Sequence, residues 1–576
     1  MIDFLEKRRR LQALLFYTVL ISVFYFPVVF AGKSLQPPLL QPHGVVSGWP
    51  YGYEGRTPVN TFNIDMATPA YYEWPINKLT GDIYKSGELP LWNPYQAGGT
   101  PLAAQYSTRV FFPYQILEDI SPVWSWDFFL LGRLLIAGFF TYLFLERLGL
   151  EHLPSLFGGA LYMFSGAFTW FINLEQFSNS AMMLPVLLHS LERLYQNRGG
   201  KDIVYSSIAF ALVILAGQPE VALYTLFLGW CWFALRVIIR RGKKELWKGV
   251  RLFLSVTVLG LMLSAPLILP FLELVKNAHH IHPQGGAMGT GTLNKKVAIG
   301  ILAPTTHEYP QEPLFYPEEF PLAREKTPQG EDFFFRIFPT NGVWDSLGGY
   351  TGTVALFLSF TGVFTALLKR GKTPLAPELY FFFGFASFVL LKNAGIAPFV
   401  WLGELPLFDL VWSQRWAGPS WVFAIASAGA IGFQILKDGP QKGLFPEETK
   451  NFSIGPVRSF FAKPFAPFVM TFMLLIFIII YIYPYRVIIY YMRYAGQYEY
   501  FAGLGPSFVI GSALAVVFMF TAFFISLNHM KGMGAIHALF PLALLELWWA
   551  MPRGYGFDWL LLKLIPFVAG IIGVYA

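Results

Sequence analysis

Long apolar runs separated by short polar segments dominate the chain. A helix that crosses the hydrocarbon core of a bilayer needs about 20 mostly apolar residues. By this measure the pattern predicts about fourteen membrane-spanning helices in an all-α polytopic membrane protein. The expected spans are residues 13–31, 125–147, 153–171, 178–195, 203–217, 219–239, 250–275, 349–368, 378–391, 416–436, 467–483, 507–527, 535–550 and 559–575.

Composition supports the same class of protein. Of the 576 residues, 55% are hydrophobic and only 13% are charged, whereas soluble chains carry roughly 25% charged residues. The net charge of +7 does not indicate a nucleic-acid partner, because the basic residues cluster at the ends of the apolar runs, where they anchor topology and contact lipid headgroups. The single cysteine, Cys231, excludes a disulfide within the chain.

The basic clusters also predict which side of the membrane each loop faces. Lys and Arg concentrate in cytoplasmic loops, so the 7–10 cluster and every second loop after it are expected inside. Two large outer loops are then 32–124 and 276–347, and a third, shorter one is 392–415. Residues 1–436 form the main transmembrane module, 437–463 a cytoplasmic connector and 464–576 further helices. The first apolar run is long and lacks a good cleavage site, so we expect a retained helix rather than a signal peptide.

The first outer loop contains an amphipathic segment. Tyr72, Ile76, Leu79 and Ile83 recur at helical spacing and define one apolar face, with Glu73 near its edge. The polar residues expected off that face are Asn77, Thr80, Asp82 and Lys85. Such a pattern predicts a helix that lies in the plane of the membrane interface.

Asp65 precedes this helix as a single carboxylate among apolar neighbours. Partial desolvation raises the pKa of such a carboxylate, which suits a general base. An N-cap for the helix that follows explains Asp equally well, so the residue chemistry leaves both interpretations open.

Other polar residues near the outer ends of the predicted helices are candidates for binding. Glu175 and Gln176 are either a solvated turn or contacts for sugar hydroxyls. Gln218 and Glu220 flank Pro219 and are either a wetted hairpin cap or functional groups at membrane depth.

Two arginines next to aromatic residues are also expected on the outer side of the membrane. The planar guanidinium of Arg415, between Trp412 and Trp416, suits phosphate oxygens, and Arg109 has the same potential. Both residues are equally typical of snorkelling anchors. His279, His280 and His282 are expected to form a polar loop rather than a metal site, because they lack ligand spacing.

Several short motifs occur in order between Asp65 and about Gly432, and together they resemble the YfhO-type bacterial membrane protein family. The most specific is Leu-Pro-Leu-Trp-Asn-Pro at 89–94. The others are Gly-Thr-Pro-Leu at 99–102, Phe-Pro at 112–113, Leu-Glu-Arg-Leu at 191–194, Gly-Gln-Pro-Glu at 217–220, Tyr-Thr-Gly at 350–352, and Leu-Pro-Leu-Phe at 405–408 leading to Arg415.

The resemblance implies a glycosyltransferase of the C superfamily in the cytoplasmic membrane, acting on its non-cytoplasmic face. The donor would be a polyprenyl-phosphate-linked sugar and the acceptor a cell-envelope glycan, lipid or protein. Asp65 would be the catalytic base, Arg415 and Arg109 would bind the donor phosphate, and the remaining candidates would contact substrate. The Asp-x-Asp metal motif of some relatives is absent around Asp65, so we expect no cofactor and no obligatory metal. The chain departs from the family in ending without its common C-terminal soluble domain.

A second class of function is a transporter or lipid-handling protein without catalytic chemistry. Many transporters show internal repeats and polar residues near the bilayer midplane. This chain shows no repeat at a fixed period, and its polar residues gather at the outer rim. Both features favour the enzyme. The two hypotheses differ in whether buried charges line a path across the bilayer.

Overall fold

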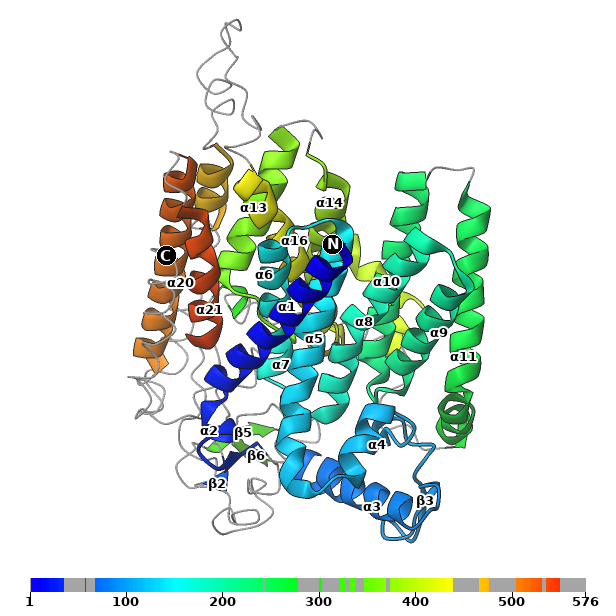
Figure 1. The fold of residues 1–576 in the computed structure, drawn as a ribbon. Helices are drawn as coiled ribbons and strands as arrows, with labels where there is room; N and C mark the ends of the chain where they lie inside the picture. The colour runs from blue at the N-terminus through cyan, green and yellow to red at the C-terminus, as the bar shows by residue number, and fades with distance from the viewer. Residues whose placement is uncertain are drawn as a thin grey trace, which may run out of the picture.

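The fold is almost entirely helical (Figure 1). In the computed structural model, the described residues are 2–35, 57–58, 68–241, 245–277, 300–302, 322–326, 332–336, 347–368, 373–438, 466–475, 504–530 and 535–549. The longer helices are α1 (Ile2–Phe24), α3 (Trp74–Lys85), α4 (Pro113–Ile120), α5 (Trp126–Leu148), α6 (His152–Met163), α8 (Glu175–Asn197), α9 (Gly200–Leu215), α10 (Pro219–Leu235), α11 (Leu246–Asn277), α13 (Thr353–Leu368), α14 (Ala376–Asn393), α16 (Gly418–Asp438), α20 (Leu504–Met530) and α21 (Leu539–Trp549).

Helices occur where the apolar pattern predicts them, with some interruptions. The third expected span is broken at Phe164–Ser165 into α6 and the short α7 (Gly166–Thr169). Four helices of the described chain are long and apolar enough to cross a membrane: Val123–Leu148, Pro219–Ile238, Leu246–Asn277 and Ser413–Asp438. These apolar helices indicate a membrane protein, whereas the number of about fourteen spans stays a prediction. The expected span 559–575 lies outside the described residues.

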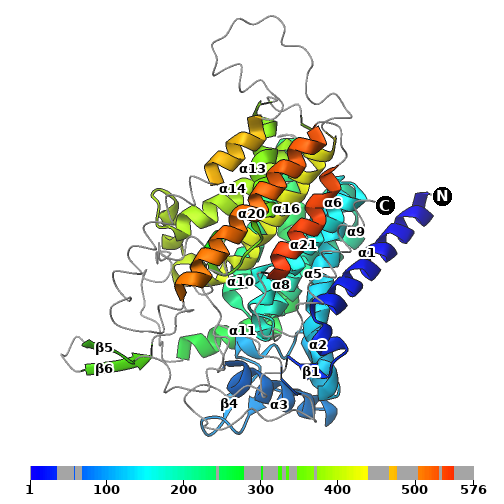
Figure 2. The same cartoon turned by 90° about the vertical axis from the view of Figure 1, so that its left-hand side faces the viewer.

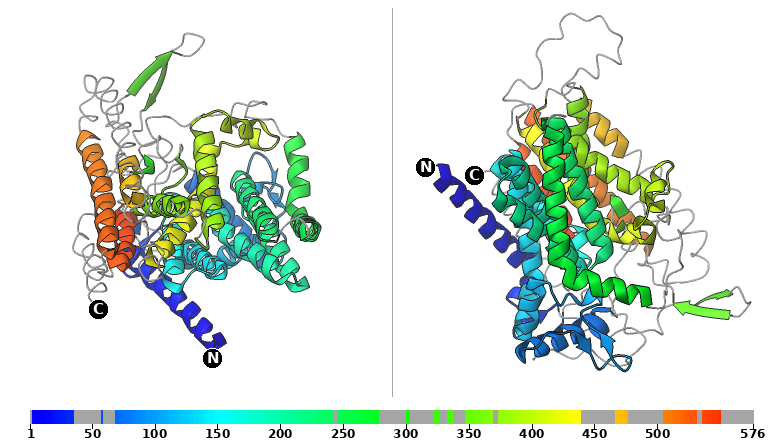
Figure 3. Two further views of the ribbon diagram at one scale, coloured as in Figure 1. Left: turned by 90° about the horizontal axis from the view of Figure 1, so that it is seen from above. Right: turned by 90° about the vertical axis from the view of Figure 1, so that its right-hand side faces the viewer.

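The centre of the bundle is formed by α5, α6, α8, α13 and α16, as Figures 2 and 3 show from three further directions. Close approach of α13 and α16 depends on glycine. A Cβ added to Gly432 would lie 2.2 Å from the carbonyl oxygen of Leu358, so only a hydrogen fits there. At one edge, α11 packs chiefly on α9 and leaves most of its apolar surface uncovered.

A buried carboxylate joins the C-terminal helix α21 to the main module, in addition to apolar packing of α20 and α21 on α13. Glu546 of α21 accepts hydrogen bonds from the backbone N–H groups of Thr353 (2.6 Å) and Val354 (2.9 Å), and from the Tyr350 hydroxyl (2.9 Å). The first N–H groups of a helix lack partners within the helix. Glu546 therefore caps α13 from a distant part of the chain, at the Tyr-Thr-Gly motif.

The two ends of the bundle differ in their polar segments. At one end lie α3 and α4, which extend beyond the bundle; we call it the α3–α4 end (Figure 1). At the opposite end, segments expected on the cytoplasmic side contact one another. Arg10 of α1 pairs with Glu146 of α5 at 3.0 Å, and Lys437 of α16 pairs with Glu151.

Strands are few and short in the described chain. β1 (Lys33–Ser34) pairs in parallel with β2 (Thr57–Pro58), and β5 (Leu322–Lys326) pairs antiparallel with β6 (Asp332–Arg336). The Leu-Pro-Leu-Trp-Asn-Pro motif supplies β3 (Trp92–Asn93), which pairs antiparallel with β4 (Thr100–Pro101). Gly98 and Gly99, both at positive φ, turn the chain between them.

Candidate functional site

The amphipathic segment of the first outer loop forms a π-helical turn, Pro69–Glu73, that continues into α3. Its apolar face packs on loop residues of the same segment, Leu102, Ala103 and Val110. Asn77 and Thr80, which the pattern places off the apolar face, are nevertheless fully buried. A second, polar face of α3 is therefore covered by protein, and only residues such as Asp82 and Lys85 are exposed.

α3 and α4 touch at Gly81. A Cβ at this position would lie 2.1 Å from the carbonyl oxygen of Asp119, which is a backbone atom that cannot rotate away. The absence of a side chain at Gly81 lets the two helices meet, and their contact turns the polar faces of both toward the bundle.

Arg109 stands at the centre of the interface between this loop and the bundle. Its side chain is fully buried. Its backbone is in the left-handed region (φ 59°), which is energetically unfavourable for a residue other than glycine. The guanidinium donates to Glu73 Oε1 (3.1 Å), to Asn77 Oδ1 (2.6 Å) and to Glu175 Oε2 (3.5 Å). Arg109 thus joins the π-helical turn, α3 and the start of α8.

Glu73 caps α8 from outside that helix. Its carboxylate accepts the backbone N–H groups of Glu175 (2.9 Å) and Gln176 (3.4 Å), while Oε1 also faces Arg109. A carboxylate at a helix N-terminus is stabilised by the unpaired N–H groups and by the helix dipole. The interaction fixes the first outer loop to the first turn of α8.

A second guanidinium, that of Arg133 in α5, extends the network. Arg133 donates to Asn179 Oδ1 (2.7 Å), Gln115 Oε1 (3.1 Å) and the Glu118 carboxylate. Gln115 in turn donates to Asp119 Oδ1 (2.8 Å) and Glu175 Oε2 (3.0 Å). We call the set the buried charge cluster; its members are Glu73, Asn77, Arg109, Gln115, Glu118, Asp119, Arg133, Glu175 and Asn179.

The buried charge cluster contains four carboxyl groups but only two guanidinium groups, all inaccessible to solvent. Burial raises the pKa of Glu118 to about 8, against the opposing effect of Arg133, and raises that of Asp119 well above its usual value. Burial also raises the pKa of Glu73 to about 7, with Arg109 opposing. Since unpaired buried charge is costly, the cluster is expected to retain about two protons near neutral pH. In keeping with this, Asp119 Oδ2 has no hydrogen-bond partner among the residues that the structure describes.

Next to the cluster lies the Gly-Gln-Pro-Glu turn between α9 and α10. The stem of Arg109 packs on Gly217, where an added Cβ would lie 2.3 Å from Arg109 Cγ. Gln218 donates to the carboxylate of Glu220 in the first turn of α10. The Glu220 carboxyl group also interacts electrostatically with the positive charge of Arg415. The Arg415 guanidinium lies 4.5 Å from the centre of the Trp416 ring.

The structure therefore brings the described candidates into one continuous region at the α3–α4 end. Glu73, Arg109, Glu175 and Gln176 are in direct contact, and Gly217 connects them to Gln218, Glu220 and Arg415. The terminal nitrogens of the Arg109 guanidinium contact Glu73, Asn77 and Glu175. Asp65 lies outside the described residues, three positions before Thr68.

Sequence reasoning missed six members of the cluster: Asn77, Gln115, Glu118, Asp119, Arg133 and Asn179. Arg133 carried a usable signal, because an arginine within an apolar span is expected to have a buried partner. The spacing of Gln115, Glu118 and Asp119 also places them on one helical face.

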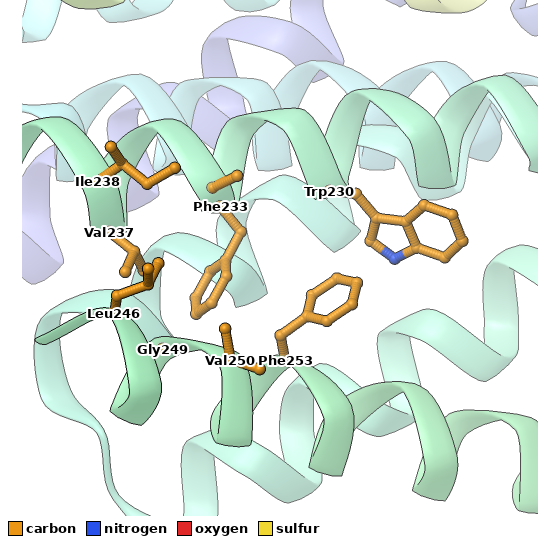
Figure 4. Close-up of a pocket in the computed structure, with 9 residues that line it drawn as sticks. Trp230, Phe233, Val237, Ile238, Leu246, Gly249, Val250 and Phe253 are labelled. Atoms are coloured by element: carbon orange, nitrogen blue, oxygen red, sulfur yellow. The ribbon is translucent and has the colours of Figure 1, made fainter. Parts of the chain in front are cut away.

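Two further features lie toward the opposite end. Arg236, which follows α10, pairs with Glu192 and with Glu378, both at 2.6 Å, and so joins α8, α10 and α14. Beside it, an apolar cavity of about 240 Å³ opens between α10 and α11 (Figure 4). Its walls include Trp230, Phe253 and Gly249, without a charged side chain.

Within the described residues, no three His, Cys, Asp or Glu side chains are grouped as metal ligands. His279, His280 and His282 lie outside those residues. No protein-family model, curated protein sequence or solved structure matches the chain.

Proposed function

We propose that the chain is a membrane glycosyltransferase that moves a sugar from a polyprenyl-phosphate donor to a cell-envelope acceptor on the non-cytoplasmic face. The observation that supports it best is the packing of Arg109 on Gly217. This contact joins the loop that follows Asp65 to the turn that carries Gln218 and Glu220, opposite Arg415. The order of motifs between Asp65 and Gly432 supports the same reaction class by resemblance.

In the proposed reaction, Asp65 removes the proton from an acceptor hydroxyl. The acceptor oxygen attacks the anomeric carbon, and the bond between that carbon and the phosphate oxygen of the donor breaks. The lipid phosphate leaves as an anion, so no general acid is required. Arg415 neutralises phosphate charge, and Gln176 and Gln218 bind sugar hydroxyls. No cofactor or metal has a part in this scheme.

The buried charge cluster has a positioning role in this proposal. A site on a loop is imprecise unless surrounding contacts fix it. The ion pairs of Arg109 and the capping of α8 by Glu73 hold the outer loop against the bundle. Lipid substrates could then enter between helices while the reacting groups keep their geometry.

The test is sugar transfer in proteoliposomes that contain the full-length protein, a radiolabelled polyprenyl-phosphate sugar and envelope extract as acceptor. We expect Asp65→Asn to abolish transfer without lowering the yield of folded protein. Asp82→Asn is the matched control, because Asp82 is exposed on the same loop and its ion pair within the described residues is with the exposed Lys78, at 2.8 Å. Undiminished transfer by Asp65→Asn would overturn the assignment of the base.

A transporter remains the alternative, and the course of α8 argues against it. The buried charge cluster lies at the start of α8, and Glu192 lies about 25 Å further along the helix. Between them, residues 181–188 of α8 are all apolar or proline and are buried. No ladder of polar groups joins the two charged regions along this helix. Uptake of a labelled lipid or sugar by the Asp65→Asn variant at the wild-type rate would favour transport.

A further inference from the structure

Lys392 differs from the buried arginines of the described chain. Arg109, Arg133 and Arg236 each form ion pairs with two carboxylates. Lys392, in the last turn of α14, is only 1% exposed, yet its described hydrogen bond goes to a neutral group, the Ser413 hydroxyl. No carboxylate of the described residues pairs with it.

The surroundings of Lys392 leave donors available. The Ser413 hydroxyl donates its own hydrogen to Asn393 Oδ1 (2.6 Å), so it accepts from Lys392. A lysine ammonium has three N–H donors, of which two remain. The dipole of the α14 C-terminus offers roughly half a unit of negative charge, which does not balance a whole buried cation.

A second donor lies at the same place. The buried hydroxyl of Tyr224, on α10, faces the Ser413 hydroxyl, which already accepts from Lys392 and donates to Asn393. Tyr224 is one turn beyond Glu220 on α10, and Arg415 is two residues beyond Ser413. The side chains of Lys392, Tyr224 and Arg415 thus come from three elements that meet at Ser413.

We propose that Lys392 and Tyr224 form an anion site for a phosphate group, adjacent to Arg415. A buried ammonium without a counter-ion is strongly unfavourable, and a phosphate supplies both the negative charge and several acceptor oxygens for donors that approach from different directions. Glu220, which interacts electrostatically with Arg415, lies one helical turn before Tyr224 on α10 and accepts its described hydrogen bond from Gln218. The phosphate belongs either to a lipid headgroup or to free phosphate. The assignment of this phosphate to the polyprenyl-phosphate donor rests on the proposed function. The existence of the anion site is independent of that function.

The test measures binding to the full-length protein in nanodiscs of phosphatidylcholine, which carry no net charge. The probes are a polyprenyl monophosphate, the uncharged polyprenol and inorganic phosphate. Lys392→Met is compared with Lys85→Met, which removes an exposed lysine from α3, and with Lys392→Arg, which keeps the charge. Thermal unfolding without probe shows whether each variant is folded.

We expect polyprenyl monophosphate to bind and stabilise the wild type and Lys85→Met, while polyprenol does not. Lys392→Met should bind it about tenfold to a hundredfold more weakly, the loss expected for a charge-assisted hydrogen bond, and Lys392→Arg should recover part of that loss. Unliganded Lys392→Met should be at least as stable as the wild type, because an uncompensated cation has been removed. Equal affinity of inorganic phosphate and the lipid would assign the site to free phosphate.

Two results would overturn the anion site. One is unchanged polyprenyl monophosphate and inorganic phosphate binding in Lys392→Met. The other is a marked loss of unliganded stability in that variant, which would mean that a carboxylate of the chain already pairs with Lys392. Anion binding that depends on Lys392, in a protein without transfer activity, would support the site and refute the glycosyltransferase.

Discussion

Arg133 is the most informative place to perturb the buried charge cluster. Arg133→Met removes a guanidinium that contacts Glu118, Gln115 and Asn179, none of which is solvent accessible. Loss of one partner from a buried ion pair typically costs about 3–5 kcal/mol, and protonation of Glu118, whose pKa burial raises to about 8, places the expected cost toward the lower end of that range. We expect a loss of this size in the free energy of unfolding.

The double variant Glu118→Met/Arg133→Met measures the interaction between the two side chains separately from the contribution of each one to stability. Replacing both partners by apolar side chains of similar size is often close to neutral. The double variant should therefore be more stable than Arg133→Met alone, by about 2 kcal/mol or more. Lys78→Met, which breaks an exposed i,i+4 pair with Asp82, should cost at most about 0.5 kcal/mol.

The assay is reversible unfolding in mixed micelles of dodecyl sulfate and a mild detergent, followed by tryptophan fluorescence at pH 7. A cost for Arg133→Met comparable to that of Lys78→Met would refute the account of the cluster as a buried ion network. Additive effects of Glu118→Met and Arg133→Met would refute the direct pairing of these two side chains.

Three further outcomes follow from the same structure. Gly81→Ala should destabilise the protein by about 1–3 kcal/mol, since its Cβ would meet the Asp119 carbonyl oxygen at 2.1 Å. The control is Gly384→Ala, inside α14 with open space around it, which should be neutral or stabilising by up to about 1 kcal/mol. Thermal unfolding distinguishes the two variants. Because folding raises the pKa values of Glu73 (to about 7) and Glu118 (to about 8), the native state binds more protons than the unfolded state. Stability should therefore fall as pH rises from about 5 to 8, by at most about 1.4 kcal/mol per pH unit for each group. Glu118→Gln should reduce that dependence on pH, and a rise in stability over this range would contradict the excess of carboxyl groups over guanidinium groups in the cluster. Arg236→Met should cost about 3–5 kcal/mol in the same unfolding assay, because Glu192 and Glu378 lose their shared partner, while transfer per folded molecule stays at the wild-type level.

The sequence predicted the helices better than the polar contacts, and the reason is physical. Apolar periodicity reports which residues avoid water, so the segments of α5, α8 and α10 were predictable. The same rule placed Asn77 and Thr80 off the apolar face of α3 but did not reveal that they are buried, because it does not identify a polar face that is covered by another polar face. Glu73, Arg109 and Glu175 were identified as candidates from their chemistry, but their pairing depends on contacts up to 102 residues apart in the chain, which no local pattern encodes.

Asp65 is the proposed base, and Glu73 is the carboxylate nearest to it in sequence among the described residues of the first outer loop. Both carboxylate oxygens of Glu73 accept hydrogen bonds from α8 or Arg109, so Glu73 holds the outer loop on the first turn of α8. Glu73→Gln should therefore lower stability by about 1–3 kcal/mol and leave transfer per folded molecule largely intact. Asp65→Asn should do the reverse, with unchanged unfolding and no transfer. Measuring turnover against the folded fraction of each variant distinguishes the two, and an inactive but fully folded Glu73→Gln beside an active Asp65→Asn would transfer the catalytic role to Glu73.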